Sequence, residues 1–422
     1  MLRFAVHLAV FALAGAGVET ILAQCPISPA TGVKAAEFDT IFTQDGPGKG
    51  IQPKGSAGWV GGDSTYSVLL PNGDTAFFFS DSYIAEWPKT KGDGTVTRAA
   101  NGLRTTEINC GPPVCDPPAS TFNAHNSIVI LSRDRKRMKT LVGPRDEKGL
   151  STSYFPNPAP DRIYWMGDAI LLPTKGKVRQ KLFVFLHKYD KAMAFFGSAV
   201  AQLDPRTLAI EKIVEVAGLP NHEIHWGSAM LEENGFLYIY GKGIRDGRKQ
   251  MFIARRPSGM TIDELTKAST WSAWDGKAWV SGLENASAII PAGDSISDEF
   301  NVVRFTVNGR PTYIFAGIDT TVPFFSWRDI TLYSSCTPQG PFTGKHAVYE
   351  MPEAGSFTVP GLAADAKLKQ QQVVYNPHIH PQFSGDGRIL ISYNINRTHN
   401  TDSIYIDGYR PRFIYVPIKG LK

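Results

Sequence analysis

The sequence has little net charge, few cysteines and no long hydrophobic run after its first residues. Lys and Arg number 44 against 39 Asp and Glu, and basic residues gather only in the short stretch 133–137. This balance leaves no extended cluster of basic residues that could bind nucleic acid, so we expect no nucleic-acid partner. No later window reaches the ~18 apolar residues of a membrane span. The four cysteines contain no CxxC pair, which disfavours zinc, and we expect no metal ligands.

The first 23 residues have the composition of a secretory signal peptide. A short positive start, Met1–Arg3, precedes the apolar run 4–18, and a small-residue cleavage site follows at Ala23. The alternative, a membrane anchor, needs a longer apolar run. We therefore expect a secreted, extracellular protein whose mature chain, after loss of residues 1–23, has no membrane contact.

The cysteine count fits an oxidising compartment, where an even number predicts disulfides. Cys110 and Cys115 bracket a stiff Gly-Pro-Pro-Val loop and are expected to pair with each other. Cys25 is then left for Cys336. Two N-glycosylation sequons, relevant only in a eukaryotic host, are present at Asn285 and Asn396.

Five segments share one layout, in which an apolar strand, a tight turn and a second, aromatic-rich strand follow one another. Asn-Gly between alternating apolar runs is a strong β-hairpin signal, and it occurs at 72–73, 234–235 and 308–309. Two looser hairpins are expected to begin at Trp165 and at His380. Because five such units follow one another, the sequence predicts an all-β chain folded as a five-bladed β-propeller. A pair of packed β-sheets is the alternative.

This repeat sets the expected domain organisation. One propeller over residues 55–422 follows an N-terminal extension at 24–54, and we expect a monomer. One short helix is predicted over Ile262–Ala268, with Thr261 as its N-cap and Glu264 at the capping-box position. Further strands are expected at Ser198–Leu203, Gln250–Arg255, Ile330–Ser334 and Arg412–Pro417.

The repeat also places acids and histidines at equivalent positions. The first strand of each propeller blade lines the central channel. Counting ten residues back from each Asn-Gly glycine reaches Asp63, His225 and Glu299. Acids and histidines of the other units, and residues two positions away on the same strand face, add Asp168, Glu223, His378 and His380. Several acids and histidines at one channel mouth predict an acid/base or metal site.

Other residues near predicted strand ends are candidates for the same mouth. Asp81 follows an apolar strand, and the tryptophans could stack on a ligand while the arginines could clamp a carboxylate or hydroxyl. Each has a structural alternative, as a turn cap, a blade-core residue or an inter-blade ion pair. These candidates are Trp59, Asp81, His125, Asn126, Trp165, Trp226, Arg410 and Arg412.

Several stretches together resemble one family of secreted bacterial and fungal proteins, long labelled as a domain of unknown function and related to five-bladed propeller glycosidases such as the endo-D-arabinanases. The stretches span roughly residues 55–417 and run at 58–67, 78–82, 124–127, 225–229, 375–381 and 409–413. The resemblance implies that Asp63 and Asp81 correspond to two functional aspartates, with Ser-Asp-Ser standing where those enzymes have a Gly-Asp-Thr-like turn. More distant arabinanase-like propellers use three acids on successive blades, which implies Asp63, Asp168 and Glu223.

Glycoside cleavage needs a protonated carboxyl as donor to the leaving oxygen and a carboxylate that activates water or attacks. We expect Asp63 to be the base or nucleophile, Asp81 or Glu223 the acid, and Asp168 a residue that tunes the acid. The predicted substrate is a polysaccharide or oligosaccharide, with an arabinose-containing glycan as one candidate. The alternatives are a non-catalytic carbohydrate- or partner-binding propeller and a metal-dependent hydrolase. No cofactor is certain, and a structural calcium ion, as in related propellers, is one candidate.

Overall fold

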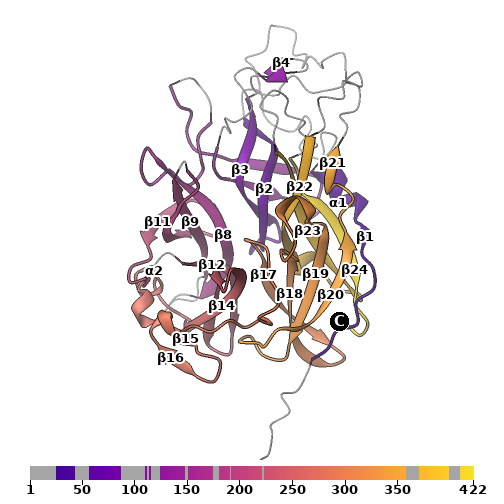
Figure 1. Cartoon of the computed structure of the whole chain (residues 1–422). Helices are drawn as coiled ribbons and strands as arrows, with labels where there is room; N and C mark the ends of the chain where they lie inside the picture. The colour runs from indigo at the N-terminus through magenta and orange to yellow at the C-terminus, as the bar shows by residue number, and fades with distance from the viewer. Residues whose placement is uncertain are drawn as a thin grey trace, which may run out of the picture.

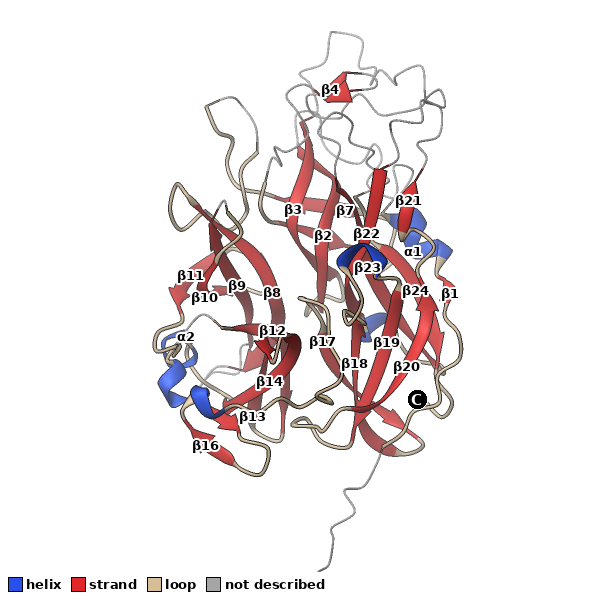
Figure 2. Ribbon diagram, in the orientation of Figure 1, coloured by secondary structure: helices blue, strands red, loops and turns tan. Residues whose placement is uncertain are grey.

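The computed structural model shows a ring of five antiparallel sheets (Figure 1). Strands dominate, and the two α-helices, α1 and α2, lie at the outside of the ring (Figure 2). No helix among the described residues is long and apolar enough to cross a membrane. The structure describes residues 25–42, 57–86, 110–111, 114–115, 124–147, 151–173, 180–190, 192–220, 223–357, 370–398 and 409–422.

Each sheet is one blade, and we number the blades along the chain. Blade I contains β2 (Ala57–Leu69), β3 (Thr75–Glu86), β6 (Ser127–Leu131) and β7 (Met138–Leu141). Blade II contains β8 (Arg162–Pro173), β9 (Gln180–Asp190), β10 (Phe195–Leu203) and β11 (Ile210–Glu215). Blade III contains β12 (Ile224–Glu233), β13 (Phe236–Arg245), β14 (Arg248–Pro257), β15 (Ser272–Trp274) and β16 (Trp279–Ser281).

The last two blades complete the ring. Blade IV contains β17 (Asn301–Val307), β18 (Arg310–Ile318), β19 (Asp329–Ser335) and β20 (Thr343–Glu350). Blade V contains β21 (Gly355–Phe357), β22 (Gln370–Ile379), β23 (Arg388–Thr398), β24 (Arg412–Pro417) and β1 (Val33–Lys34). The inner strands contact one another in the order β2, β8, β12, β17 and β22, and β22 returns to β2. The prediction of an all-β, five-bladed propeller is confirmed.

Side chains that alternate between the two faces of each strand build the core between the blades. In β3, Phe78 packs toward blade II, whereas Phe77 and Phe79 pack on the other face with Phe42 and Phe413. All five phenylalanines are at most 2% exposed. Because successive side chains of a strand point to opposite faces, a run of phenylalanines fills both inter-blade spaces at once.

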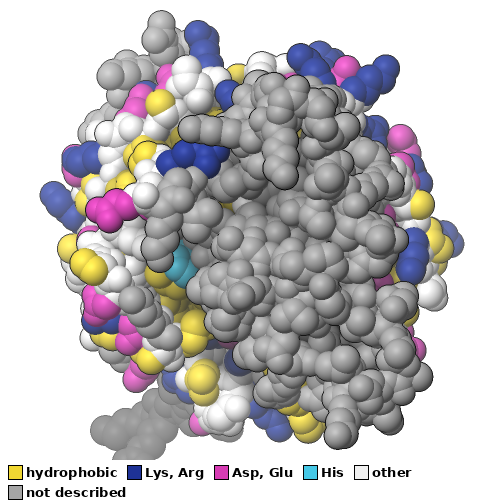
Figure 3. All heavy atoms as spheres, turned by 90° about the horizontal axis from the view of Figure 1, so that it is seen from above, with side chains coloured by type: hydrophobic (Ala, Val, Ile, Leu, Met, Phe, Trp, Pro, Cys, Tyr) yellow, Lys and Arg dark blue, Asp and Glu magenta, His cyan; other side chains and the backbone are white. Residues whose placement is uncertain are grey.

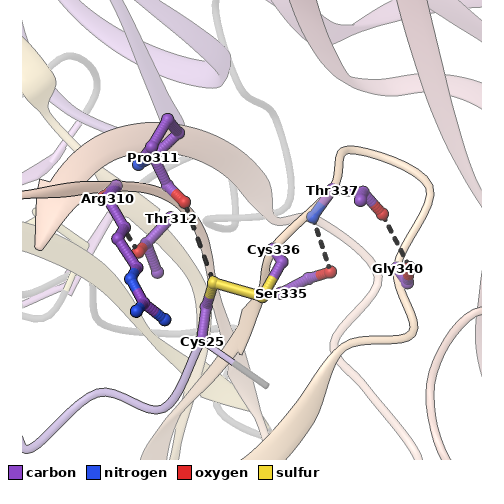
Figure 4. Close-up of a disulfide and its surroundings, with 8 residues drawn as sticks. All are labelled: Cys25, Arg310, Pro311, Thr312, Ser335, Cys336, Thr337 and Gly340. Carbon is purple, nitrogen blue, oxygen red and sulfur yellow. Dashed lines mark hydrogen bonds between the residues drawn. A yellow bond between two sulfur atoms is a disulfide. The ribbon is translucent and has the colours of Figure 1, made fainter. Parts of the chain in front are cut away.

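The segment predicted as a separate N-terminal extension belongs in part to blade V. β1 pairs with β24, and the two strands lie side by side at the right edge of Figure 1. Helix α1 (Ala36–Ile41) follows, and its Phe38 packs on Phe383 and Phe413. The predicted bond between Cys25 and Cys336 is present, with a Cα–Cα distance of 5.1 Å (Figure 4). It fixes the N-terminal segment to blade IV.

Two local predictions need correction. The fifth hairpin does not begin with a strand at His380, because Pro381–Phe383 forms the 3₁₀ turn η4 and the preceding strand is β22. Pro381 has no N–H for a strand ladder, which explains the turn. The predicted helix is shorter, since α2 covers Ile262–Leu265, but its capping box is present. The remaining 3₁₀ turns are η1 (Ala268–Thr270), η2 (Leu283–Asn285) and η3 (Phe324–Ser326).

Two other predictions concern residues whose structure is not described or is described in part. The signal peptide lies outside the described residues. Strands β4 (Cys110–Gly111) and β5 (Val114–Cys115) set Cys110 opposite Cys115 in register, but their side chains, and so their predicted disulfide, also lie outside.

Candidate functional site

One cavity of about 580 Å³ collects side chains from all five blades. A view of the molecule from above shows charged side chains of both signs around the outer edge of this face, and a histidine beside hydrophobic side chains (Figure 3). The cavity is lined by Asp63, Ser80, Asp81, Trp165, His187, Tyr189, Met193, His225, Lys242, Asp298, Glu299, Phe324, Trp327, Val373, Tyr375, Asn376, Asn396 and Tyr409.

The pairing register of the inner strands shifts near the residues that line this cavity. β2 shifts against β3 on either side of Asp63, and β22 shifts against β23 between Tyr375 and His378. Equivalent shifts lie beside Gly167 in β8 and Gly227 in β12. A β-bulge redirects side chains and bends its strand. The bulges therefore turn polar residues such as Asp63 and Tyr375 into the ring.

Asp63 is a carboxyl with a strongly raised pKa. Burial, followed by the negative charge of Asp81, raises its pKa from 3.8 to about 7, against opposing hydrogen bonds from Tyr375 and Tyr409. The Tyr375 hydroxyl donates to Oδ2 at 3.0 Å. Oδ1 is buried and has no hydrogen-bond partner among the described residues. Near neutral pH this group can hold a proton and give it up.

Asp81 is held in a different environment on the adjacent strand. Its Oδ1 lies 3.0 Å from the Trp165 indole nitrogen, which donates to it, and 2.8 Å from Nδ1 of His125. His125 is 34% exposed at its side chain, whereas Asp81 is 12% exposed. Donors to a carboxylate orient it and stabilise its charge. The partners of Asp63 and Asp81 therefore differ, although both carboxyls face one cavity.

Glu299 is a third carboxyl in the same cavity. Burial, followed by the charge of Asp63, raises its pKa well above the usual value. Its Oε1 accepts a hydrogen bond from Ser64 Oγ at 2.9 Å, and Ser64 Oγ also lies at hydrogen-bond distance, 2.6 Å, from Ser80 Oγ. Its Oε2 lies 3.9 Å from Nε2 of the buried His378. Glu299 is thus a carboxyl with a raised pKa that is tied to the bulge that carries Asp63.

The opposite wall carries histidines and an ion-paired lysine. His225 stacks on Phe195 with ring centroids 3.8 Å apart, and burial lowers its pKa to about 2. Burial likewise lowers the pKa of His187 to about 4. The nearly buried Lys242 lies 3.1 Å from Asp298, at Nζ and Oδ1. At neutral pH this wall therefore presents uncharged imidazoles beside one ion pair.

Asp298 itself remains an anion. Burial raises its pKa, but the charges of Lys242 and Lys249 outweigh burial and lower it to about 2. Asp298 and Glu299 are adjacent in sequence and have opposite pKa shifts, because only the first has cationic partners.

Asp168 does not line the cavity. Its Oδ1 accepts from the backbone N–H of Ala169 at 2.8 Å, and its Oδ2 accepts from that of Met230 at 2.7 Å. Burial nevertheless raises its pKa to about 7. Both carboxylate oxygens are thus occupied by backbone groups, and the residue joins blade II to blade III.

Several other predicted site residues also lie elsewhere. Asn126 is buried and exchanges hydrogen bonds with the backbone of Phe155, and Trp226 belongs to the blade core. His380 bonds to Ser67 at 2.6 Å, between Nδ1 and Oγ. The remaining residues outside the lining of the cavity are His125, which contacts Asp81, Trp59, which packs on Phe42 and Phe79, the exposed Glu223, the buried His378 and Arg410, and Arg412, which faces Glu353.

The two predicted glycosylation sites differ in their surroundings. Asn285 is exposed on η2, where a surface sequon is expected. Asn396 pairs with Val373 between β23 and β22 and lines the cavity.

Sequence analysis overlooked Tyr375 and Tyr409, which surround Asp63, and His187, Tyr189 and Lys242 on the opposite wall. The Tyr-Asn-Pro-His stretch that begins at Tyr375 was a usable signal, since it carries a bulge equivalent to that of Asp63. Lys242 lies within β13, the aromatic-rich second strand of blade III, and had no signal of its own. Within the described ranges, no three His, Cys, Asp or Glu side chains converge as a metal site. The predicted calcium ion stays a prediction.

A family model described as "Domain of unknown function (DUF5005)" matches residues 54–417. The chain belongs to this family. None of the curated proteins matches this DUF5005 chain. The predicted resemblance to a family of unknown function is thereby confirmed.

Several solved structures are similar to this DUF5005 member, and the first of them supports its fold. A Bacteroides ovatus protein provisionally described as a hydrolase is 20% identical, with a TM-score of 0.62, over 91% of this chain and 89% of its own. A thermostable family-43 glycoside hydrolase is 13% identical, with a TM-score of 0.41, over 87% and 94%. An exo-β-1,3-galactanase of Phanerochaete chrysosporium is 8% identical, with a TM-score of 0.43, over 84% and 60%. At these identities a likeness concerns the fold and assigns no activity.

Proposed function

We propose that this protein is a glycoside hydrolase that cleaves a polysaccharide at the cavity, with Asp63 and Asp81 as its two carboxyls. The observation that carries the proposal is the contrast between these neighbours. Burial raises the pKa of Asp63 to about 7, whereas Asp81 accepts the Trp165 N–H and lies 2.8 Å from Nδ1 of His125. Glycosidases need one protonated and one ionised carboxyl on either side of the scissile bond.

Asp63 is the general acid in this proposal. It donates its proton to the glycosidic oxygen as the bond to the anomeric carbon breaks, and the leaving sugar departs as an alcohol. This reverses the roles expected from the sequence, which made Asp63 the base. The reversal rests on the raised pKa of Asp63 and on its tyrosine partners.

Asp81 is the carboxylate that stabilises the positive charge developing at the anomeric carbon. It either takes a proton from the attacking water or forms the glycosyl bond that water later cleaves. Trp165 and His125 hold its Oδ1. Glu299 replaces Glu223 and Asp168 as the third acid, and it acts as a positioning residue through Ser64.

The substrate class follows from the shape and lining of the cavity. Aromatic side chains, uncharged imidazoles and a few fixed polar groups suit a neutral sugar, because they offer hydrogen bonds and flat apolar surfaces together. We propose a neutral glycan, with arabinose-containing polysaccharides as the first candidates, and an extracellular site of action. The Cys25–Cys336 disulfide supports export, since such bonds persist in oxidising compartments.

The test is the release of oligosaccharides from a panel of arabinans, arabinogalactans, xylans and β-glucans. Wild type and Asp246→Asn, a control at an exposed turn, should both release products. Asp63→Asn and Asp81→Asn should each lose a factor of about 10² or more in kcat, the typical contribution of acid/base groups. Full turnover by Asp63→Asn refutes the proposed acid. Retention of one glycan without release by wild type indicates instead the non-catalytic binding propeller.

A further inference from the structure

An exposed apolar surface lies at the rim of the cavity. We define the aromatic lip as residues 322–327, between β18 and β19, with the sequence Val-Pro-Phe-Phe-Ser-Trp. Val322, Phe324 and Phe325 are 42%, 44% and 38% exposed. Phe324 and Trp327 also line the cavity. The lip therefore continues the wall of the site outward, which distinguishes it from scattered surface hydrophobics.

The lip is held rigidly. Trp327 is 7% exposed, and its indole nitrogen donates to the backbone oxygen of Val322 at 3.1 Å. Phe324 packs edge-on against Trp327 with ring centroids 4.7 Å apart. Lys249 Nζ lies 4.9 Å from the centroid of the Trp327 ring. These contacts fix the Phe324 ring without burying it, so little side-chain entropy is lost when a ligand binds.

The chemistry of the lip restricts what it can bind. None of its six residues is charged, so it offers no ion pair to an acidic or basic partner. A flat ring next to a cavity lined with hydrogen-bonding groups suits a molecule that is polar at its edges and apolar on one face. A neutral sugar ring has this character, because its C–H bonds face one side while its hydroxyls point outward.

We propose that the aromatic lip is a binding platform for a sugar unit outside the cavity, with the Phe324 ring against the apolar face of that unit. The proposal rests on the polysaccharide substrate proposed above and adds to it. The substrate is a chain that continues beyond the cavity, so that one unit occupies the cavity while a neighbouring unit lies on the lip. Binding strength should therefore rise with chain length.

The test is retardation of the native protein in gels that contain soluble arabinan, arabinogalactan, xylan or β-glucan. Phe324→Ala should bind the retarding glycan about tenfold more weakly, as for the loss of one aromatic contact. Phe324→Tyr keeps the ring and should bind as wild type does. Leu69→Ala, a control at an equally exposed position in the hairpin of β2, should also bind normally.

The outcomes separate this proposal from the proposed function. Retardation by no glycan, or equal retardation of Phe324→Ala and wild type, overturns the platform. A melting temperature of Phe324→Ala well below that of Leu69→Ala also overturns it, because the contact with Trp327 then serves the stability of the fold and not ligand binding. If binding depends on Phe324 but no product is released, the proposed glycosidase activity is wrong and the platform stands. If products are released but binding does not depend on Phe324, the platform is wrong and the proposed glycosidase activity stands.

Discussion

Replacing Asp63 by Asn should stabilise the protein at neutral and alkaline pH while it removes activity. Asp63 binds its proton more tightly in the folded state, where its pKa is about 7, than in the unfolded state, where 3.8 is the reference. The stabilisation from this proton is complete below pH 3.8. This stabilisation is lost as the pH rises toward 7. Between these two pKa values the unfolded chain releases the proton while the folded protein keeps it, and above them the folded protein must hold a buried carboxylate.

The magnitude follows from the difference between these two values. Each pKa unit corresponds to about 1.4 kcal/mol, so Asp63 costs roughly 4 kcal/mol of unfolding free energy at pH 8 relative to a non-titrating residue. Asn has nearly the same shape, and its amide oxygen can still accept the Tyr375 hydroxyl hydrogen bond. We expect Asp63→Asn to gain about 2–4 kcal/mol over wild type at pH 8 and almost nothing at pH 4.

The assay is urea unfolding at pH 4, 6 and 8, compared between wild type and Asp63→Asn. The titration of Asp168, whose pKa burial also raises, is common to both proteins and cancels in the difference. Asp246→Asn makes the same chemical change at an exposed turn and should show no pH-dependent gain. A stability difference that is the same at pH 4 and pH 8 would refute the buried, proton-holding Asp63.

Three further predictions concern the site, the ring and the disulfide. Asp81→Asn should lower the pKa of Asp63, because one negative neighbour is removed, and ¹³C NMR of the carboxyl carbons would show this; an unchanged value contradicts their coupling. Gly167→Ala should lower the melting temperature and cost about 1–3 kcal/mol of unfolding free energy. The added Cβ would lie 2.6 Å from a backbone oxygen of the next inner strand. An unchanged melting temperature contradicts that close approach. Cys25→Ser should cost about 2–5 kcal/mol in urea unfolding, and added reductant should destabilise wild type by that much more than it destabilises the variant. Equal stability of the two proteins would show that the bond to Cys336 contributes nothing.

The sequence by itself determined the blades. Asn-Gly turns at 72–73, 234–235 and 308–309 require left-handed backbone, and Asn234 and Asn308 adopt it with φ of 51°. These local signals predicted three of the five hairpins, and counting back from them correctly brought Asp63, His225 and Glu299 to one cavity. Local patterns succeed here because a hairpin is stabilised by residues close in sequence.

Only the tertiary structure decided which acids remain available. Asp168 and Asp63 occupy similar places in their blades, yet backbone N–H groups from blades II and III hold both oxygens of Asp168. Asp63 instead meets Tyr375, more than 300 residues later, because ring closure sets β22 beside β2. Burial and long-range partners set the pKa of a carboxyl, and neither is encoded in the residues next to it.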